Sequence, residues 1–204
     1  MPYYAAMGCG FQTGAGTILN VLKPSKDDSV VIFGLGGVGL AALMAAKSLG
    51  VKQIVAVDLL PSKLKTATEL GATDTINAGE EKNIIAKVKE VCGKNVDDKG
   101  RKRAGGDYAI DCTGVLRVIE QCIKCLAPCG TAVTVGVPPP DKKISIDPLT
   151  FLLENKRYIG VIEGDSVPAE VSQDSISRRE ESLLLTRNSS FRSWLRCIRR
   201  AAFQ

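Results

Sequence analysis

Three glycines near the start of the chain have a spacing that suits the binding of phosphate groups. Gly34, Gly36 and Gly39 follow the apolar run Val30–Phe33 and precede a helical pattern over residues 40–46. In such a turn the first glycine allows a tight bend, the second lets the backbone approach a diphosphate, and the third lets helix and strand pack closely. Free N–H groups at the helix start then attract the phosphates. The pattern predicts a dinucleotide-binding turn.

An acidic residue follows at the distance at which such a turn is commonly paired with a carboxylate. Asp58 ends the apolar run Ile54–Val57 and lies 19 residues after Gly39. At this place a carboxylate accepts hydrogen bonds from both ribose hydroxyls of NAD and repels the 2′-phosphate of NADP. We therefore predict NAD as the cofactor. The alternative is that Asp58 is an exposed residue that only caps the helix after it.

Strand and helix patterns alternate around these residues. Six short apolar runs separated by helical patterns predict an α/β fold, a doubly wound parallel sheet of the Rossmann type with strand order 3-2-1-4-5-6. The ligand should then lie across the C-terminal ends of the first and fourth strands. A helix with many small residues should precede the sheet and end before Pro24. The strands are expected at residues 30–33, 54–58, 73–76, 108–111, 131–137 and 157–162, with helices at 61–70, 84–92 and 115–126.

Length and composition limit the class of protein. A chain of 204 residues is large enough for one domain with a full core. It contains no apolar run of about 18 residues that would predict a membrane span. The number of cysteines is odd, seven in all, which is typical of a reducing compartment and not of a disulfide framework. We expect a cytoplasmic protein.

The net charge of +5 does not indicate nucleic-acid binding, because it comes mainly from the end of the chain. Residues 171–204 carry seven arginines against three acidic residues and contain no lysine. The charged segment 94–106 has no interleaved aromatic residues, so it is interpreted as a solvated loop. We expect residues 1–168 to form the NAD-binding domain and residues 169–204 an atypical, disordered arginine- and serine-rich tail.

Two interpretations of that tail stay open. Its abrupt change in amino-acid usage is what a shifted reading frame or a translated intron would produce. Alternatively, Phe191, Trp194, Leu195 and Ile198 fall at helical spacing among arginines. That pattern is typical of a basic amphipathic helix that binds an anionic membrane or a partner groove.

Two smaller groups of residues have a chemical and a plain structural interpretation. Cys122, Cys125 and Cys129 have the spacing C-x-x-C-x-x-x-C, but no fourth metal ligand accompanies them, so packing in the core is the favoured role. Asp111 and Asp165 follow the patterns of two different strands. Nothing in the sequence brings them together as an acid–base pair, which favours ordinary loop and capping roles.

A series of motifs then occurs along the chain in a characteristic order: Gly8–Gly16, Gly34–Gly39, Asp58 with Lys63, Glu69–Asp74, Asp111–Gly114 and Val135–Pro138. Together they resemble the zinc-type, medium-chain alcohol dehydrogenases, most of all the microbial aryl-alcohol or benzyl-alcohol branch. The resemblance runs from about residue 5 to 168 and covers the coenzyme-binding domain. From Val171 onward no resemblance is found.

The resemblance implies roles for individual residues. Cys9 matches a ligand of the family's catalytic zinc. Thr13 and Val38 match residues that pack against the nicotinamide, and Asp58 with Lys63 matches the contacts to the adenosine ribose. The implied coenzyme contacts are Thr13, Gly34, Gly36, Gly37, Val38, Gly39, Asp58, Lys63, Thr113, Val135 and Val137.

The sequence also departs from the family. Members begin with a catalytic domain that supplies further zinc ligands, one of them a histidine, whereas this chain contains no histidine. A catalytic zinc needs three protein ligands, which Cys9 alone does not provide. We therefore expect the coenzyme-binding part of an NAD-dependent alcohol dehydrogenase, inactive by itself. Zinc and a small alcohol or aldehyde belong to the full-length form, and a homo-oligomer is compatible with it. The alternative is a non-catalytic NAD-binding or partner-binding module.

Overall fold

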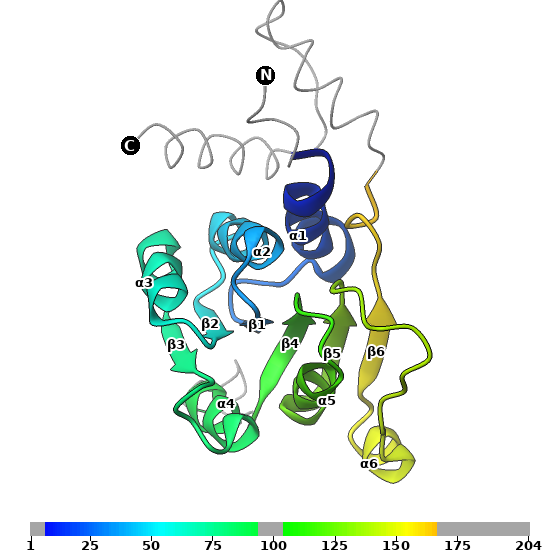
Figure 1. The fold of residues 1–204 in the computed structure, drawn as a ribbon. Helices are drawn as coiled ribbons and strands as arrows, with labels where there is room; N and C mark the ends of the chain where they lie inside the picture. The colour runs from blue at the N-terminus through cyan, green and yellow to red at the C-terminus, as the bar shows by residue number, and fades with distance from the viewer. Residues whose placement is uncertain (1–6, 94–103, 167–204) are drawn as a thin grey trace, which may run out of the picture.

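Six parallel strands form one sheet in a computed structural model that describes residues 7–93 and 104–166 (Figure 1). The strand order is β3-β2-β1-β4-β5-β6, which confirms the predicted doubly wound topology. Every neighbouring pair runs parallel. The strands are β1 (Ser29–Phe33), β2 (Gln53–Asp58), β3 (Asp74–Asn77), β4 (Gly106–Asp111), β5 (Leu126–Thr134) and β6 (Arg157–Gly160).

Helices cover both faces of this sheet. The first group consists of η2 (Met7–Phe11), α1 (Gln12–Gly16), η3 (Thr17–Leu22), α2 (Gly37–Ser48) and α3 (Pro61–Leu70). The second group consists of α4 (Ile84–Cys92), α5 (Leu116–Lys124) and α6 (Pro148–Leu153). Figure 1 shows the first group above the strands and the second group below them.

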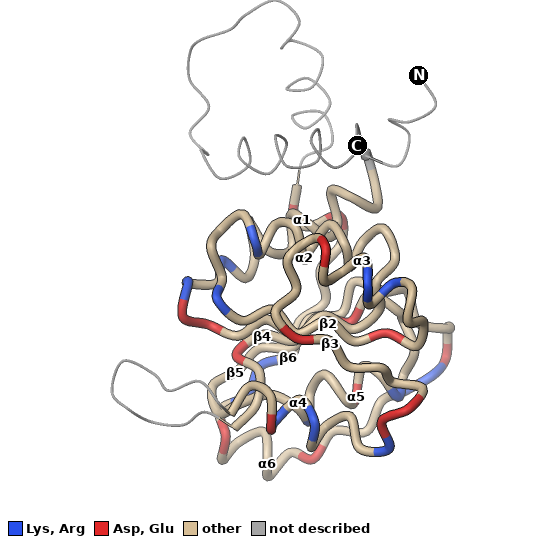
Figure 2. The backbone as a smooth tube through the Cα atoms, turned by 90° about the vertical axis from the view of Figure 1, so that its left-hand side faces the viewer, with Lys and Arg blue, Asp and Glu red and all other residues tan. Residues whose placement is uncertain are grey.

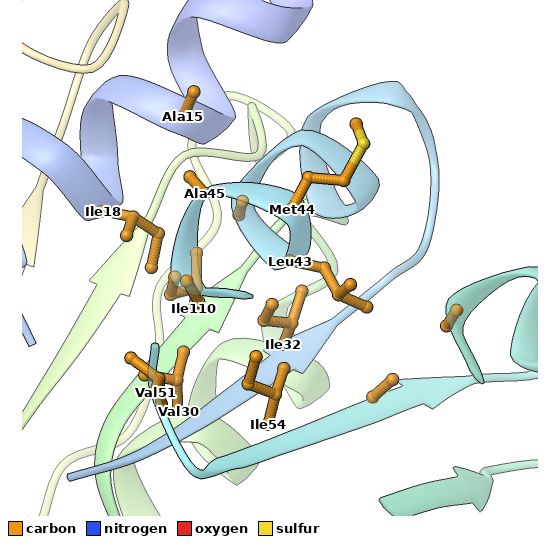
Figure 3. Packing of buried hydrophobic residues seen from close by; sticks show 14 of the residues in the cluster. Ala15, Ile18, Val30, Ile32, Leu43, Met44, Ala45, Val51, Ile54 and Ile110 are labelled. Carbon is orange, nitrogen blue, oxygen red and sulfur yellow. The ribbon is translucent and has the colours of Figure 1, made fainter. Parts of the chain in front are cut away.

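The two faces have separate apolar cores because successive side chains of a strand point to opposite sides. Val30 and Ile32 pack with the first group of helices, whereas Val31 and Phe33 pack with the second. The first core is seen closely in Figure 3, where Leu43 lies over Ile32 and Ile54 and Ile18 lies beside Ile110. The run Val30–Phe33 is apolar at every position because a central strand of a parallel sheet is buried on both faces.

Local sequence signals set the ends of several helices. Pro61 stands at the first turn of α3, and Gly71 ends that helix in the left-handed region with φ +113°. Ala72 N donates to Ala67 O and Gly71 N donates to Thr68 O, the pair of bonds that satisfies the last carbonyl groups of a helix. Asp147 accepts a hydrogen bond from Leu149 N at the start of α6. These signals were readable from the sequence.

The predicted N-terminal helix is more loosely wound than an α-helix over much of its length, with hydrogen bonds between residues five apart. Two π-helical stretches, η2 and η3, flank the five residues of α1. The helix ends at Leu22, after which Lys23 adopts φ +48°. Asn20 Nδ2 donates to Gly164 O at 3.0 Å, and Gln12 Nε2 donates to Ser166 O at 3.4 Å. These bonds attach the segment after β6 to this helix.

The predicted bounds of the strands differ from the structure by one or two residues in most cases and by more in β5. β5 begins at Leu126, inside the predicted helix 115–126, because Leu126 already pairs with Gly106 of β4 before an irregular stretch shifts the register. β5 ends at Thr134 rather than at residue 137, because Val135 N and Gly136 N both turn to the carbonyl oxygen of Asp111. β6 ends at Gly160 rather than at residue 162.

Some predictions fall outside the described residues. These are the tail 169–204 with its possible amphipathic helix and most of the charged loop 94–106. Within residues 7–93 and 104–166, no helix is long and apolar enough to cross a membrane. Basic and acidic residues are interspersed along the described part of the chain, as Figure 2 shows.

The crossing of α1 and α2 yields the first test. A methyl group on Gly14 would overlap the carbonyl oxygen of Val38, whereas a methyl group on Gly10 would meet nothing closer than Val38 Cγ2 at 3.8 Å. We expect Gly14→Ala to lower the free energy of unfolding by about 3 kcal/mol, because backbone atoms cannot move aside cheaply. Gly10→Ala is the matched control and should change it by no more than about 1 kcal/mol. Denaturant unfolding measures both, and equal midpoints would contradict this account of the crossing.

Candidate coenzyme site

The turn between β1 and α2 contains two glycines, Gly34 and Gly39, that leave no room for a side chain. Gly34 has φ +89°, and a side chain on it would come within 2.6 Å of Thr113 Cγ2. A methyl group on Gly39 would overlap the carbonyl oxygen of Gly34. The turn is therefore held close to α2 on one side and to the loop after β4 on the other.

The other two glycines face open space. Nothing lies within 4 Å of the place where a side chain on Gly36 or Gly37 would begin, and both residues are exposed. No side chain caps the first turn of α2. The site thus combines free backbone N–H groups, the positive end of a helix and room beside the chain, which is the combination that suits a phosphate group.

Asp58 lies at the end of β2, next to this turn. Its Oδ2 atom accepts a hydrogen bond from Leu35 N at 2.7 Å, and its Oδ1 atom accepts one from Leu60 N at 3.0 Å. Lys63 Nζ stands 3.8 Å from Oδ2, and the Asp58 side chain is only 8% exposed. The bond to Leu60 N closes a short turn ahead of α3, and no side chain caps the first turn of that helix, so the alternative of an exposed capping residue does not describe Asp58. The bond to Leu35 joins Asp58 to the glycine turn as well.

A second carboxylate lies at the end of β4. Asp111 is fully buried, and burial is the main cause that raises the pKa of its carboxyl group. Hydrogen bonds from Thr113 and Gly114 act in the opposite direction. Asp165 is exposed and lies after β6, in the segment attached to η3. The two acids therefore have separate local roles, as the sequence favoured.

The loop after β4 and the end of β5 touch each other through backbone atoms. A side chain on Gly114, which has φ +71°, would overlap Val137, and one on Gly136 would overlap Gly114 N. Thr113 is exposed, Val135 is half-buried and Val137 is 90% exposed. These predicted contact residues form one continuous border beside the glycine turn.

The helix η2–α1 lies on the other side of the turn. The backbone of Gly14 contacts Val38 O closely, which brings the preceding residue, Thr13, to the neighbourhood of Val38. Thr13 is 8% exposed and Val38 is half-buried. Both side chains predicted to face the nicotinamide thus come from two elements that are in contact.

The residues present do not fit a catalytic zinc. Cys9 is exposed on η2. Among the described residues, no group of three or more histidine, cysteine, aspartate or glutamate side chains is arranged to hold a metal. One thiolate does not supply the three protein ligands that such a zinc requires.

Most of the other described cysteines are buried and inert. Burial raises the pKa of Cys92 to about 12, and it also raises the pKa of Cys112, Cys122 and Cys125. A thiol that stays protonated is a poor metal ligand and nucleophile. Cys122 and Cys125 are core residues, as expected, whereas Cys129 is exposed and has φ +65°.

Two apolar residues at the same edge of the sheet were missed by the sequence analysis. Leu59 directly follows Asp58 and is 64% exposed, and Val115 directly follows Gly114 and is 53% exposed. β2 and β4 flank β1, so these side chains stand on either side of the glycine turn. The signal available in the sequence was an apolar residue placed just after each predicted contact residue.

A hollow of about 260 Å³ lies elsewhere, between the start of α4 and α5. It contains none of the predicted contact residues. Its charged lining consists of Lys82, Arg117, Glu120 and Lys124. We attach no function to it, because Glu120 is bound by Lys124 and by Ser145 N.

The chain is similar in sequence and in structure to known proteins. The family model described as zinc-binding dehydrogenase matches residues 37–178. A probable alcohol dehydrogenase from a Pseudomonas species is 37% identical over 161 residues, which is 78% of this chain and 47% of the relative. Benzyl alcohol dehydrogenase from Acinetobacter calcoaceticus is 34% identical with a TM-score of 0.71, covering 85% of this chain and 46% of that one.

A more distant structure agrees in fold. It is a Sinorhizobium meliloti protein described as a zinc-binding dehydrogenase and solved bound to NADP, 23% identical with a TM-score of 0.68. It covers 87% of this chain and 49% of that one. The chain therefore spans about half the length of the relatives it matches.

The glycine turn yields the second test. We expect Gly39→Ala to lower the free energy of unfolding by about 3 kcal/mol, because its methyl group would overlap Gly34 O. Gly36→Ala should leave that free energy within about 0.5 kcal/mol of the wild type, because its methyl group would project into open space. Thermal and denaturant unfolding of the two variants check this contrast. Equal losses of stability would show that the turn is packed differently.

Proposed function

The chain belongs to the zinc-binding dehydrogenase family, and on that premise we propose that it is the part of an alcohol dehydrogenase that binds NAD(H). The observation that carries the proposal is the open glycine turn beside the Asp58 carboxylate. Free N–H groups at the start of α2 suit the diphosphate of the coenzyme, and Gly36 and Gly37 leave room for it. The turn lies on β1, whose neighbour β4 marks the point where strand order reverses.

The same geometry supports a preference for NAD over NADP. The Asp58 carboxylate is already bound by Leu35 N and Leu60 N, so it is rigid and its negative charge stays at the edge of the site. Its remaining lone pairs suit the two hydroxyls of an adenosine ribose, and Lys63 balances part of its charge. A 2′-phosphate at this position meets a like charge. Leu59 and Val115 offer apolar surfaces to the adenine.

The nicotinamide end is assigned to the border formed by α1 and the loops after β4 and β5. Thr13 and Val38 pack against one face of the ring in this proposal, and Val135 and Val137 border it. When bound, the nicotinamide accepts the hydride from the alcohol carbon. The residues of this chain only bind and orient it.

Catalysis is not assigned to this chain by itself. Cys9 supplies one ligand where a zinc that binds an alkoxide needs three. The whole reaction, and the zinc that serves it, belong in this proposal to a form that includes the rest of the length of the relatives. The alcohol itself is proposed only as a class, the primary alcohols, aromatic ones included.

A homo-oligomer is proposed on separate grounds. β6 is at the edge of the sheet, and an edge strand has free backbone groups that a second copy of the same strand can pair with. The nearby helix α6 exposes Leu149, Leu152 and Leu153. Large apolar side chains in such a group are typical of an interface between copies.

The coenzyme preference is tested at Asp58. The wild-type chain should bind NADH more tightly than NADPH, and Asp58→Asn should narrow the ratio of the two dissociation constants by about tenfold, because it removes the like charge. Asp27→Asn is the matched control, since Asp27 pairs only with Lys52 on the exposed surface. Fluorescence titration gives the two dissociation constants, for NADH and for NADPH, of the wild type and of each variant. Tighter binding of NADPH by the wild type would refute the role given to Asp58.

The lack of catalysis is tested directly. The purified chain, supplied with NAD, benzyl alcohol and zinc ions, should form no NADH above the background without protein. The reason is the single thiolate at Cys9, which leaves the metal without a complete ligand set. Absorbance of NADH and the zinc content of the dialysed protein are the two readouts. Turnover together with one bound zinc per chain would show that a complete site exists.

A further inference from the structure

We propose that Asp111 is a positioning residue for the coenzyme: its buried carboxylate holds the loops that border the site, although it does not touch the coenzyme itself. The inference rests on the proposed function and deepens it. Neither the glycine motif nor the spacing to Asp58 involves this residue. The argument comes from the hydrogen bonds and close contacts at the end of β4.

Asp111 occupies a central place in the sheet. It is the last residue of β4 and the partner in register of Phe33, the last residue of β1. The glycine turn begins at the next residue, Gly34. Asp111 has no exposed surface, so a ligand at the edge of the sheet cannot reach its carboxylate while the loops keep this arrangement.

Three donors of the following loop point at the carboxylate. Thr113 N lies 2.9 Å and Thr113 Oγ1 lies 2.6 Å from Oδ1. Gly114 N lies 3.2 Å from Oδ2. The carboxylate therefore accepts from two successive residues and holds the loop in a tight turn ahead of α5, as an aspartate does at the start of a helix.

This loop in turn positions two neighbouring segments. The methyl group of Thr113 lies against Gly34, which leaves no room for a side chain there. Gly114 packs on the backbone of Val137. The carbonyl oxygen of Asp111 also accepts hydrogen bonds from Val135 N and Gly136 N. The glycine turn, the loop after β4 and the end of β5 are thus all held, directly or through one contact, by Asp111.

The arrangement needs the ionised form of the carboxyl group. Two ionised oxygens accept all three hydrogen bonds, whereas a protonated oxygen becomes a donor that faces an N–H group or forces the Thr113 hydroxyl to turn and accept. Burial raises the pKa of Asp111 above the usual range, so protonation begins at a higher pH than at an exposed aspartate. The charge of Asp111 acts in turn on the thiols of Cys112 and Cys122, whose pKa is raised mainly by burial, so that they stay uncharged.

Coenzyme binding and stability should therefore respond to pH in opposite directions. A raised pKa in the folded state means that Asp111 favours folding most when it is protonated, and this contribution is lost as the pH rises through the folded pKa. Binding of the coenzyme, in contrast, requires the ionised carboxylate and weakens as the pH falls. A residue that served stability alone would make the two properties change together.

The experiment compares Asp111→Asn with Asp147→Asn in the full chain. Asp111→Asn keeps one acceptor oxygen but turns an NH2 group toward at least one of the three donors. The control changes an aspartate that likewise accepts from a following backbone N–H and from a threonine hydroxyl, but it precedes α6, which Figure 1 shows beside the start of β6. Titration with NADH and denaturant unfolding are carried out across a range of pH from neutral to mildly acidic.

We expect Asp111→Asn to raise the dissociation constant for NADH by about tenfold at neutral pH, and Asp147→Asn to leave it unchanged. As the pH falls, the wild type should lose affinity but gain stability relative to Asp111→Asn. Thr113→Val removes the hydroxyl that donates to Asp111 and accepts from Val115 N. It should show a smaller loss in the same direction, and it decides the question if Asp111→Asn does not fold.

The results that would contradict the role of Asp111 can be told apart from the result that would contradict coenzyme binding itself. The role of Asp111 would be overturned if Asp111→Asn had the same affinity for NADH and the same pH dependence as the wild type. If Asp111→Asn is unfolded, the same comparison is made with Thr113→Val. In both cases NADH binding by the wild type, and with it the proposed function, would stand. A loss in Asp147→Asn as large as that in Asp111→Asn would also overturn it, because the effect would be general. A wild-type chain that does not bind NADH would overturn both proposals.

Discussion

Close approach of backbone to backbone is the constraint on which this structure depends. α2 can lie on the turn after β1 only because Gly39 meets Gly34 O, and α1 can cross α2 only because Gly14 meets Val38 O. The same kind of contact joins Gly114 to Val137 across the loops after β4 and β5. Any side chain at these places would push two elements apart. The proposed coenzyme site lies where three such contacts bring separate segments together.

Two carboxylates, at the ends of β2 and β4, show how a difference in burial gives the same side chain different roles. Asp58 and Asp111 each accept backbone N–H groups from the residues that follow them. Asp58 retains a little exposed surface and a nearby lysine, so its charge is available to a ligand in the proposed function. Asp111 is enclosed, so its charge can act only on the loops around it. Position relative to the sheet edge, and not residue type, separates a recognition role from a positioning role.

The chain spans about half the length of its relatives. Its described residues suit a coenzyme and do not complete a metal site. The features that suit a coenzyme come from within one sheet and its helices. A metal site draws ligands from several segments, and the described part supplies only Cys9 toward it. In the proposed function, this half therefore binds the coenzyme without the rest, and the hydride transfer is assigned to the longer form.

The sequence alone determined the strand order, the glycine turn and the place of Asp58, because these depend on local periodicity and on spacing along the chain. It also separated Asp111 from Asp165. Only the tertiary structure decided what Asp111 holds and where β5 begins. The same applies to Gly14, which lies against a residue far along the chain, and to the exposed sides of Leu59 and Val115. The physical reason is that contacts between segments distant in sequence leave no periodic signal and are set by how the helices and loops meet over the sheet.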